Sequence, residues 1–176
     1  MHPACLPVEE LLKNCTLRLQ RRSGPGGQHR NKVETAVVIV HDETRIAGEA
    51  SERRSQADNR RMAVFRLRLA LATQLRSPIQ SSLAINCDDR PSDGPSELWR
   101  LRSANGRIRC AADHEDFPAL LAELLDHLAR LDDGLTAAAT FFDVSSSQLV
   151  RLLRQHPPAL QMLNASRQQH GLHKLT

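Results

Sequence analysis

Residues 16–41 read TLRLQRRSGPGGQHRNKVETAVVIVH, and the rest of the predicted fold is built around this stretch. Residues 16–21 alternate apolar and polar side chains, which predicts a strand. Residues 36–41 are apolar and rich in β-branched side chains, which predicts a buried strand. Between them, residues 23–28 are rich in glycine and proline and predict a loop, and residues 29–35 predict a short helical turn.

The chain that follows completes a small α+β unit. Residues 42–44 predict a tight turn, and residues 45–49 predict the returning arm of a hairpin. Ser55 carries a side chain that caps helices, and a helix is predicted from about Gln56 to Gln74. The predicted order is therefore β-α-β-β-α, and the fold class of this unit is α+β.

Two faces are predicted for this helix. Its apolar residues recur at i, i+4 spacing and predict a face that packs on the sheet: Ala63, Leu67, Leu71 and Leu75. Its basic residues predict an exposed opposite face: Arg60, Arg61, Arg66 and Arg68.

Charge divides the chain into a basic front and a slightly acidic back. Residues 11–80 hold 14 basic and 6 acidic side chains, a net charge of +8, whereas residues 81–176 have a net charge of −2. Most of the basic residues are arginine, which suits bidentate contact with phosphate. Aromatic residues make up only 3% of the chain, which argues against RNA binding by stacked aromatic rings.

The charge break coincides with a composition break. We predict a catalytic-type domain over residues 11–80, a Ser, Pro, Asp and Gly-rich linker over residues 81–95, and a mainly helical region over residues 96–176. The last region is also a candidate surface for a protein partner.

Within that last region, residues 98–102 and 107–110 predict the arms of a short β-hairpin around Asn105-Gly106. Four helices are predicted after it: residues 117–131, 135–142, 146–155 and a segment following Pro157-Pro158. The turn at residues 143–145 gives helix–turn–helix spacing, which favours nucleic-acid binding. The acidic balance of the region favours helical packing or protein contact instead.

Several classes of protein are excluded by what the sequence lacks. No apolar run approaches the ~20 residues that span a bilayer, and the start MHPACLPVEELLKNC does not resemble a secretory or mitochondrial leader. We therefore expect a cytoplasmic protein with no membrane contact. The histidines do not have the spacing of a metal-ligand set, so neither a metal nor a cofactor is expected.

The glycine-rich loop has its own chemistry. It lacks the spacing of a P-loop and the third glycine of a dinucleotide-binding turn. Its bare backbone can approach a crowded site closely, and Gln28 at its tip can donate hydrogen bonds to a developing oxyanion. Basic residues on both sides can contact phosphate: Arg21, Arg22, Arg30 and Lys32. The alternative on composition alone is an ordinary surface turn.

Ser23-Gly24-Pro25-Gly26-Gly27-Gln28-His29-x-Asn31-Lys32 resembles the GGQ signature of class I peptide chain release factors and of the related ribosome-rescue peptidyl-tRNA hydrolases. The resemblance continues through Glu34-Thr35-Ala36-Val37 and resumes at Arg54-Ser55-Gln56-x-x-Asn59. It covers about residues 15–75, in order.

The resemblance implies roles for individual residues. Gly26, Gly27 and Gln28 would enter the peptidyl transferase centre of the ribosome, where Gln28 would help water attack the ester of peptidyl-tRNA. Contacts with rRNA are expected from a larger set: Arg21, Arg22, Ser23, His29, Arg30, Asn31, Lys32, Arg53, Arg54, Gln56 and Arg60. Ser55 is either a helix cap or an RNA contact, and Gln56 and Asn59 either brace the sheet or touch RNA.

The predicted function is a release factor-like protein that hydrolyses the peptidyl-tRNA ester on the ribosome without reading a codon. Only about 15 residues precede the GGQ unit, which leaves no room for a codon-reading domain. Residues 160–176 hold only Arg167 and Lys174 as fixed cations, unlike the basic tail of rescue hydrolases. The alternative is a non-catalytic regulator that keeps the GGQ fold and binds ribosomes or RNA.

Overall fold

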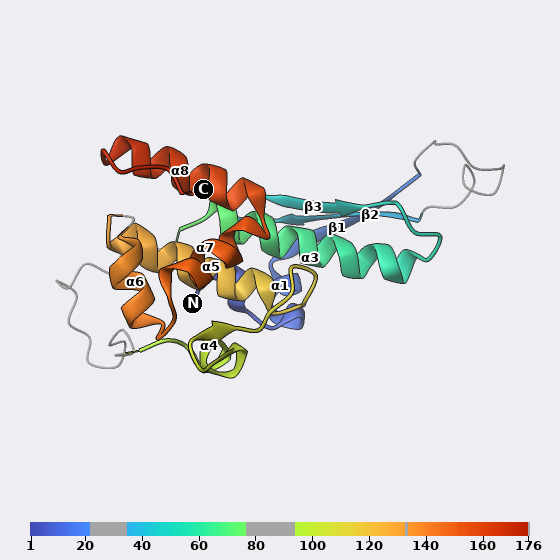
Figure 1. The fold of residues 1–176 in the computed structure, drawn as a ribbon. Helices are drawn as coiled ribbons and strands as arrows, with labels where there is room; N and C mark the ends of the chain where they lie inside the picture. The colour runs from blue at the N-terminus through green and yellow to red at the C-terminus, as the bar shows by residue number, and fades with distance from the viewer. Residues whose placement is uncertain (22–34, 77–93, 133, 176) are drawn as a thin grey trace, which may run out of the picture. The chain divides into compact units, whose positions relative to one another are not determined.

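The computed structural model describes residues 1–21, 35–76, 94–132 and 134–175. These residues form two compact units, Met1–Leu75 and Arg76–Thr176 (Figure 1). The GGQ motif and most of the predicted 81–95 linker lie outside the described residues. Over the part of the chain that is described, no helix is long and apolar enough to cross a membrane.

The first unit is a three-stranded antiparallel sheet with one long helix against it (Figure 1). The sequence predicts these three strands and this helix, whereas the helical turn predicted over residues 29–35 lies almost wholly outside the described residues. The strand order is β1-β2-β3, with Gln20 opposite Ala36 at one end of the β1–β2 pair and Cys15 opposite His41 at the other. The elements are η1 (Pro3–Cys5), α1 (Val8–Lys13), β1 (Cys15–Gln20), β2 (Ala36–His41), β3 (Ala47–Ala50) and α3 (Gln56–Gln74).

Helix α3 packs closely on β2 and β3 because a glycine lies under it. Ala63 and Leu67 on the helix are fully buried, as is Ile39 on β2, which pairs with Gly48 on β3. A Cβ atom at Gly48 would lie 2.2 Å from the carbonyl oxygen of Ala63 and 2.4 Å from the amide nitrogen of Leu67. The approach of helix to sheet therefore requires a residue without a side chain at position 48.

Arg68 does not lie on an exposed face of α3, as the sequence predicts, but is buried. The sequence placed Arg68 with the exposed arginines, but only 9% of it is exposed. Its Nε donates a hydrogen bond of 3.0 Å to the carbonyl oxygen of Ala4, which is itself fully buried. The short helix η1, Pro3–Cys5, thus covers a second face of α3, a long-range contact that helical periodicity cannot reveal.

Strand β1 is much more exposed than β2. Leu17 and Leu19 are each 40% exposed, and in register they lie opposite the buried residues Ile39 and Val37. The returning arm of the hairpin begins at Ala47 instead of the predicted residue 45, because Arg45 has a φ of 61°, a left-handed turn conformation.

The second unit is mainly helical. Its first element is a helix over Glu97–Arg102, so the strand predicted for residues 98–102 is wrong. Ser96 caps this helix, since its Oγ accepts a hydrogen bond of 3.1 Å from the Trp99 amide. The elements are α4 (Glu97–Arg102), β4 (Ser103–Ala104), β5 (Arg107–Ile108), α5 (Phe117–Arg130), α6 (Leu135–Phe141), α7 (Ser146–Arg154) and α8 (Pro157–Gln169).

The predicted Asn-Gly turn joins β4 and β5. Asn105 and Gly106 have φ values of 53° and 69°, the left-handed pair that such a turn requires. The hairpin is shorter than predicted, because α4 occupies the residues assigned to its first arm.

The core of this unit is built on α5 and a small aromatic cluster. Trp99 is 1% exposed, and its ring centroid lies 3.9 Å from that of Phe142. His127 of α5 stacks on Phe141 with a centroid distance of 4.0 Å. Several α5 leucines are buried beside this cluster: Leu120, Leu121, Leu124, Leu125 and Leu128.

Candidate functional site

The described residues that flank the GGQ motif belong to two paired strands. Gln20 and Ala36 are the last partners in the β1–β2 register on the side of the motif. The sheet therefore brings together the points at which the chain leaves β1 and enters β2. The predicted catalytic residues Gly26, Gly27 and Gln28 lie outside the described residues.

Asn59 of α3 fixes the second of these points. Its side chain is fully buried, and its Nδ2 donates hydrogen bonds of 2.7 Å to the Thr35 carbonyl and 2.9 Å to the Arg53 carbonyl. Its Oδ1 accepts a hydrogen bond of 2.9 Å from the Arg53 amide. Of the two roles that the sequence left open for Asn59, the structure shows bracing, because a buried side chain with all these contacts is occupied.

Ser55, at the start of α3, also has a structural role. Its Oγ accepts a hydrogen bond of 3.2 Å from the Asp58 amide, so Ser55 is the helix N-cap. Gln56, which follows it, is exposed. Contact between Gln56 and RNA stays a prediction.

Acidic side chains near the start of α3 are engaged by particular arginines. Glu52 pairs with Arg66, whose Nη1 also donates 2.7 Å to the Glu49 carbonyl, and Asp58 pairs with Arg61. A hydrogen bond from the Ser51 amide lowers the pKa of the Glu52 carboxyl most, and the Glu52 amide and then Arg66 lower it further.

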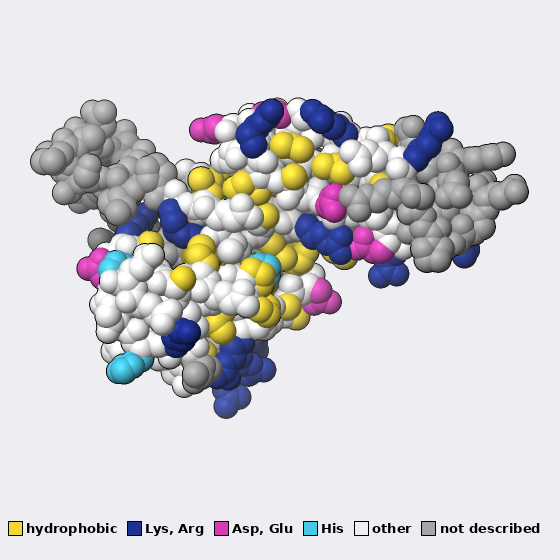
Figure 2. Space-filling model, turned by 90° about the horizontal axis from the view of Figure 1, so that it is seen from above, with side chains coloured by type: hydrophobic (Ala, Val, Ile, Leu, Met, Phe, Trp, Pro, Cys, Tyr) yellow, Lys and Arg dark blue, Asp and Glu magenta, His cyan; other side chains and the backbone are white. Residues whose placement is uncertain are grey.

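The remaining arginines of this region are exposed and make no ion pair with a described carboxylate: Arg53, Arg54 and Arg60. Arg21, at the end of β1, is exposed as well. Figure 2 shows Lys and Arg side chains on the surface, with hydrophobic side chains exposed between them. The charge of Arg53, Arg54 and Arg60 is therefore directed to solvent, where a polyanion could meet it.

The other predicted RNA-contacting residues lie outside the described part of the chain: Arg22, Ser23, His29, Arg30, Asn31 and Lys32. Among the residues that are described, no group of three or more His, Cys, Asp or Glu side chains is placed to hold a metal ion.

Comparison with known proteins places the first unit in context. The RF-1 domain family matches residues 9–94. The chain is 34% identical over 114 residues to "Peptide chain release factor 1" of Acidiphilium cryptum, a match that covers 64% of this chain and 32% of that protein. It is 44% identical over 59 residues to "Peptide chain release factor 1-like, mitochondrial" of Rattus norvegicus, which covers 34% of this chain and 16% of the rat protein.

A third relative is "Peptide chain release factor PrfB1, chloroplastic" of Arabidopsis thaliana, which is 42% identical over 66 residues, 38% of this chain and 14% of that protein. The chain thus matches a third or less of the length of each of these relatives. Helices α5 to α8 of the second unit lie beyond the residues that the RF-1 domain family matches.

Proposed function

Residues 9–94 belong to the RF-1 domain family of class I peptide chain release factors, and from this premise we propose that the chain is a codon-independent, ribosome-dependent peptidyl-tRNA hydrolase. The observation that carries the proposal is the GGQ motif, Gly26-Gly27-Gln28, inside the matched segment. Its partners would be large-subunit rRNA at the peptidyl transferase centre and peptidyl-tRNA.

The proposed chemistry is attack of water on the ester carbonyl that joins peptide to tRNA. The backbone N–H of Gln28 would donate a hydrogen bond to the oxyanion of the tetrahedral intermediate. Collapse of that intermediate breaks the ester bond, so that the peptide leaves with a carboxylate and the tRNA regains its ribose hydroxyl. Gly26 and Gly27 would allow the backbone to approach the reacting ester closely.

The described residues support this proposal at the base of the motif. Asn59 ties Thr35 to the turn before α3, and strand pairing ends at Gln20 and Ala36, so both neighbours of segment 22–34 are anchored to one sheet. A rigid base is what a catalytic tip needs, since small displacements of a reacting group are costly. The exposed arginines Arg53, Arg54 and Arg60 would contact rRNA phosphates.

A peptide-release assay tests the proposal. Ribosomes that carry radiolabelled formylmethionyl-tRNA are prepared with a stop codon, with a sense codon, or with no codon in the A site. We expect the full chain to release formylmethionine from all three complexes, and Gly27→Ala to slow release about 100-fold or more. Arg61→Gln, which removes an exposed arginine already paired with Asp58, is the matched control and should keep full activity.

Two results would overturn parts of this proposal. Release only at stop codons would contradict codon independence and leave a conventional release factor. Absence of release from every complex, together with salt-sensitive ribosome binding that Gln28→Ala leaves intact, would establish the non-catalytic regulator instead. That second function is favoured by one observation, namely the folded helices α5 to α8 outside the matched family.

A further inference from the structure

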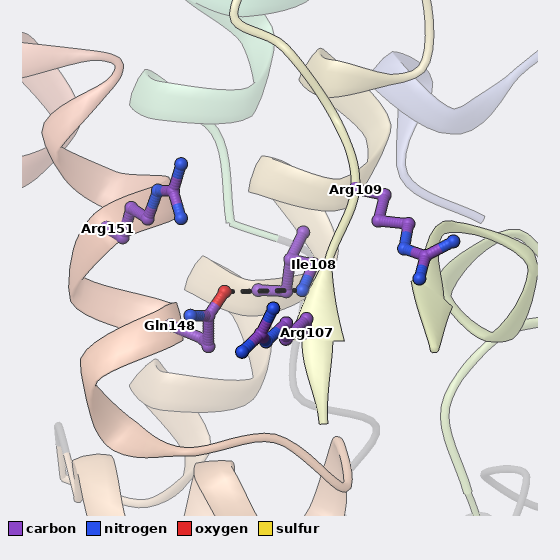
Figure 3. Close-up of a pocket in the computed structure, with 5 residues that line it drawn as sticks. All are labelled: Arg107, Ile108, Arg109, Gln148 and Arg151. Carbon is purple, nitrogen blue, oxygen red and sulfur yellow. Dashed lines mark hydrogen bonds between the residues drawn. The ribbon is translucent and has the colours of Figure 1, made fainter. Parts of the chain in front are cut away.

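A cationic groove lies within the second unit, between the β4–β5 hairpin and helix α7. It has a volume of about 520 Å³ and is lined by Arg107, Ile108, Arg109, Gln148 and Arg151 (Figure 3). The Ile108 amide donates a hydrogen bond of 3.3 Å to Gln148 Oε1, which joins the hairpin to α7. The groove is therefore a built feature of this unit, with walls from two elements.

One wall of the groove is the second helix of a helix–turn–helix arrangement. Helices α6 and α7 contact each other and are separated by residues 142–145, where Asp143 has a φ of 50° and Val144 is buried. Ser145 caps α7 by accepting a hydrogen bond of 3.4 Å from the Gln148 amide.

Helix α7 presents its polar side to the groove. Its apolar residues are buried in the unit: Leu149, Leu152 and Leu153. Arg151 on the opposite side is exposed. In Figure 3, Arg107 lies beside Gln148 on the side of the hairpin that faces α7, Arg151 projects from α7, and Arg109 extends from the hairpin away from α7. The hairpin beside α7 thus adds positive charge on both of its sides.

Several acidic side chains of the second unit are engaged by other residues of the same unit. Asp116 pairs with Arg102 at 2.7 Å, and Glu123 accepts hydrogen bonds of 2.8 Å and 2.6 Å from the amide and hydroxyl of Ser96. Asp126 pairs with Arg76. These acidic side chains are used to hold the unit together.

The groove arginines are left without acidic partners among the residues that the structure describes. Arg107, Arg109 and Arg151 are all exposed, and none of them forms an ion pair with a described carboxylate. An anion in the groove would therefore be held by these arginines.

We propose that this groove binds the phosphodiester backbone of RNA, with Arg107 and Arg151 contacting phosphates on the α7 side and Arg109 contacting the strand where it passes the hairpin. Guanidinium groups make bidentate contacts with phosphate, and a half-buried amide such as Gln148 adds a neutral hydrogen-bonding group. The choice of RNA over DNA rests on the proposed function, because a protein that acts on the ribosome meets RNA.

The test is the salt dependence of RNA binding by the full chain. Binding of a fluorescein-labelled RNA hairpin is followed by fluorescence anisotropy over a range of KCl concentrations. We expect Arg107→Gln/Arg151→Gln to weaken binding and to reduce the slope of log K against log [KCl] by about two, one for each lost phosphate contact. The matched control, Arg100→Gln/Arg130→Gln, removes the same charge from exposed positions outside the groove and should keep the slope.

Equal slopes for the groove and control variants would overturn the proposal. Tighter binding of a DNA hairpin of the same sequence, with the same loss of slope, would overturn the choice of RNA. Peptide release keeps the two proposals apart: loss of binding slope without any GGQ-dependent release would contradict the proposed function alone. Unchanged Trp99 fluorescence of the variants checks that the second unit is folded, since Trp99 is the one tryptophan of the chain.

Discussion

Asn59 donates a 2.7 Å hydrogen bond from its side-chain amide to the carbonyl oxygen of Thr35, which lies 24 residues earlier in the chain. The same side chain accepts a hydrogen bond from the Arg53 amide and donates one to the Arg53 carbonyl. One buried residue thus joins the start of β2, the turn before α3 and α3 itself. The candidate catalytic segment therefore depends on a residue that need not touch any substrate.

Replacement of Asn59 by alanine tests this dependence. Loss of its donors leaves buried backbone groups unpaired, so we expect Asn59→Ala to lower the free energy of unfolding by about 3 kcal/mol. Peptide release should fall more than ribosome binding, because the side chain positions the segment without contacting RNA. Urea unfolding and the release assay measure the two effects, with Gln56→Ala as the exposed control for stability. Normal stability of Asn59→Ala would contradict the bracing role.

Gly48→Ala tests the close approach of α3 to the sheet. The added methyl group would lie 2.2 Å from the Ala63 carbonyl oxygen, so the helix backbone must move away from β3. We expect a loss of about 3 kcal/mol or more in the free energy of unfolding, measured in urea by circular dichroism. Ala47→Ser, an exposed position on the same strand, should change it by less than about 0.5 kcal/mol. If Gly48→Ala changed the free energy of unfolding as little as Ala47→Ser, α3 and the sheet could move apart at low cost and the close approach would not require glycine.

Arg68→Ala tests the contact between α3 and the N-terminal residues. The change removes the hydrogen bond to the Ala4 carbonyl and the packing of the arginine stem. We expect faster amide hydrogen exchange over residues 2–6 and a loss of about 2 kcal/mol in stability. The paired but exposed Arg61 provides the comparison, since Arg61→Ala should leave exchange in residues 2–6 unchanged.

The second unit should lose stability in mild acid. Burial, with a smaller effect of Arg130, lowers the pKa of His127 below its ordinary value of 6.5, and burial also lowers the pKa of His156. The unfolded chain therefore takes up these protons more readily than the folded unit. Stability is complete above the unfolded pKa and is lost as the pH falls from about 6.5 towards the folded pKa values.

Urea titrations followed by Trp99 fluorescence at several pH values measure this loss. His127→Phe keeps an aromatic ring against Phe141 but cannot be protonated, so its stability should vary less with pH. His173→Gln, on the exposed C-terminal segment, is the control and should retain the wild-type dependence. A His127→Phe profile identical to wild type would assign the effect to other groups.

The parts of the fold that local signals determine were predictable from the sequence. Ser55 and the apolar spacing after it predict α3 with the bounds that the structure shows. Asn105-Gly106 predicts its turn equally well. Residues 98–102 were predicted wrongly. Apolar and polar side chains alternate over residues 99–102, Trp-Arg-Leu-Arg, but this span is too short to distinguish a strand from a helix, and the Ser96 cap favours the helix.

What depends on tertiary contact could not be predicted. The pattern of α3 gives no sign that η1 would cover Arg68, because it predicts one apolar face and identifies no partner for a second face. The candidate site likewise has one part that the sequence predicts and one part that it does not. The bracing contacts of Asn59 emerge only from the fold, whereas the motif that they support was recognised from its residues alone.

The position of Asn59 also limits how far the molecule can be dissected. A synthetic peptide that contains Gly26-Gly27-Gln28 and both flanking strands, but ends before residue 59, would have the motif without the anchor at Thr35. During synthesis, the same contact cannot form until α3 has emerged and docked. On the proposed function, catalytic competence would thus be acquired late, as a property of the completed unit and not of the motif itself.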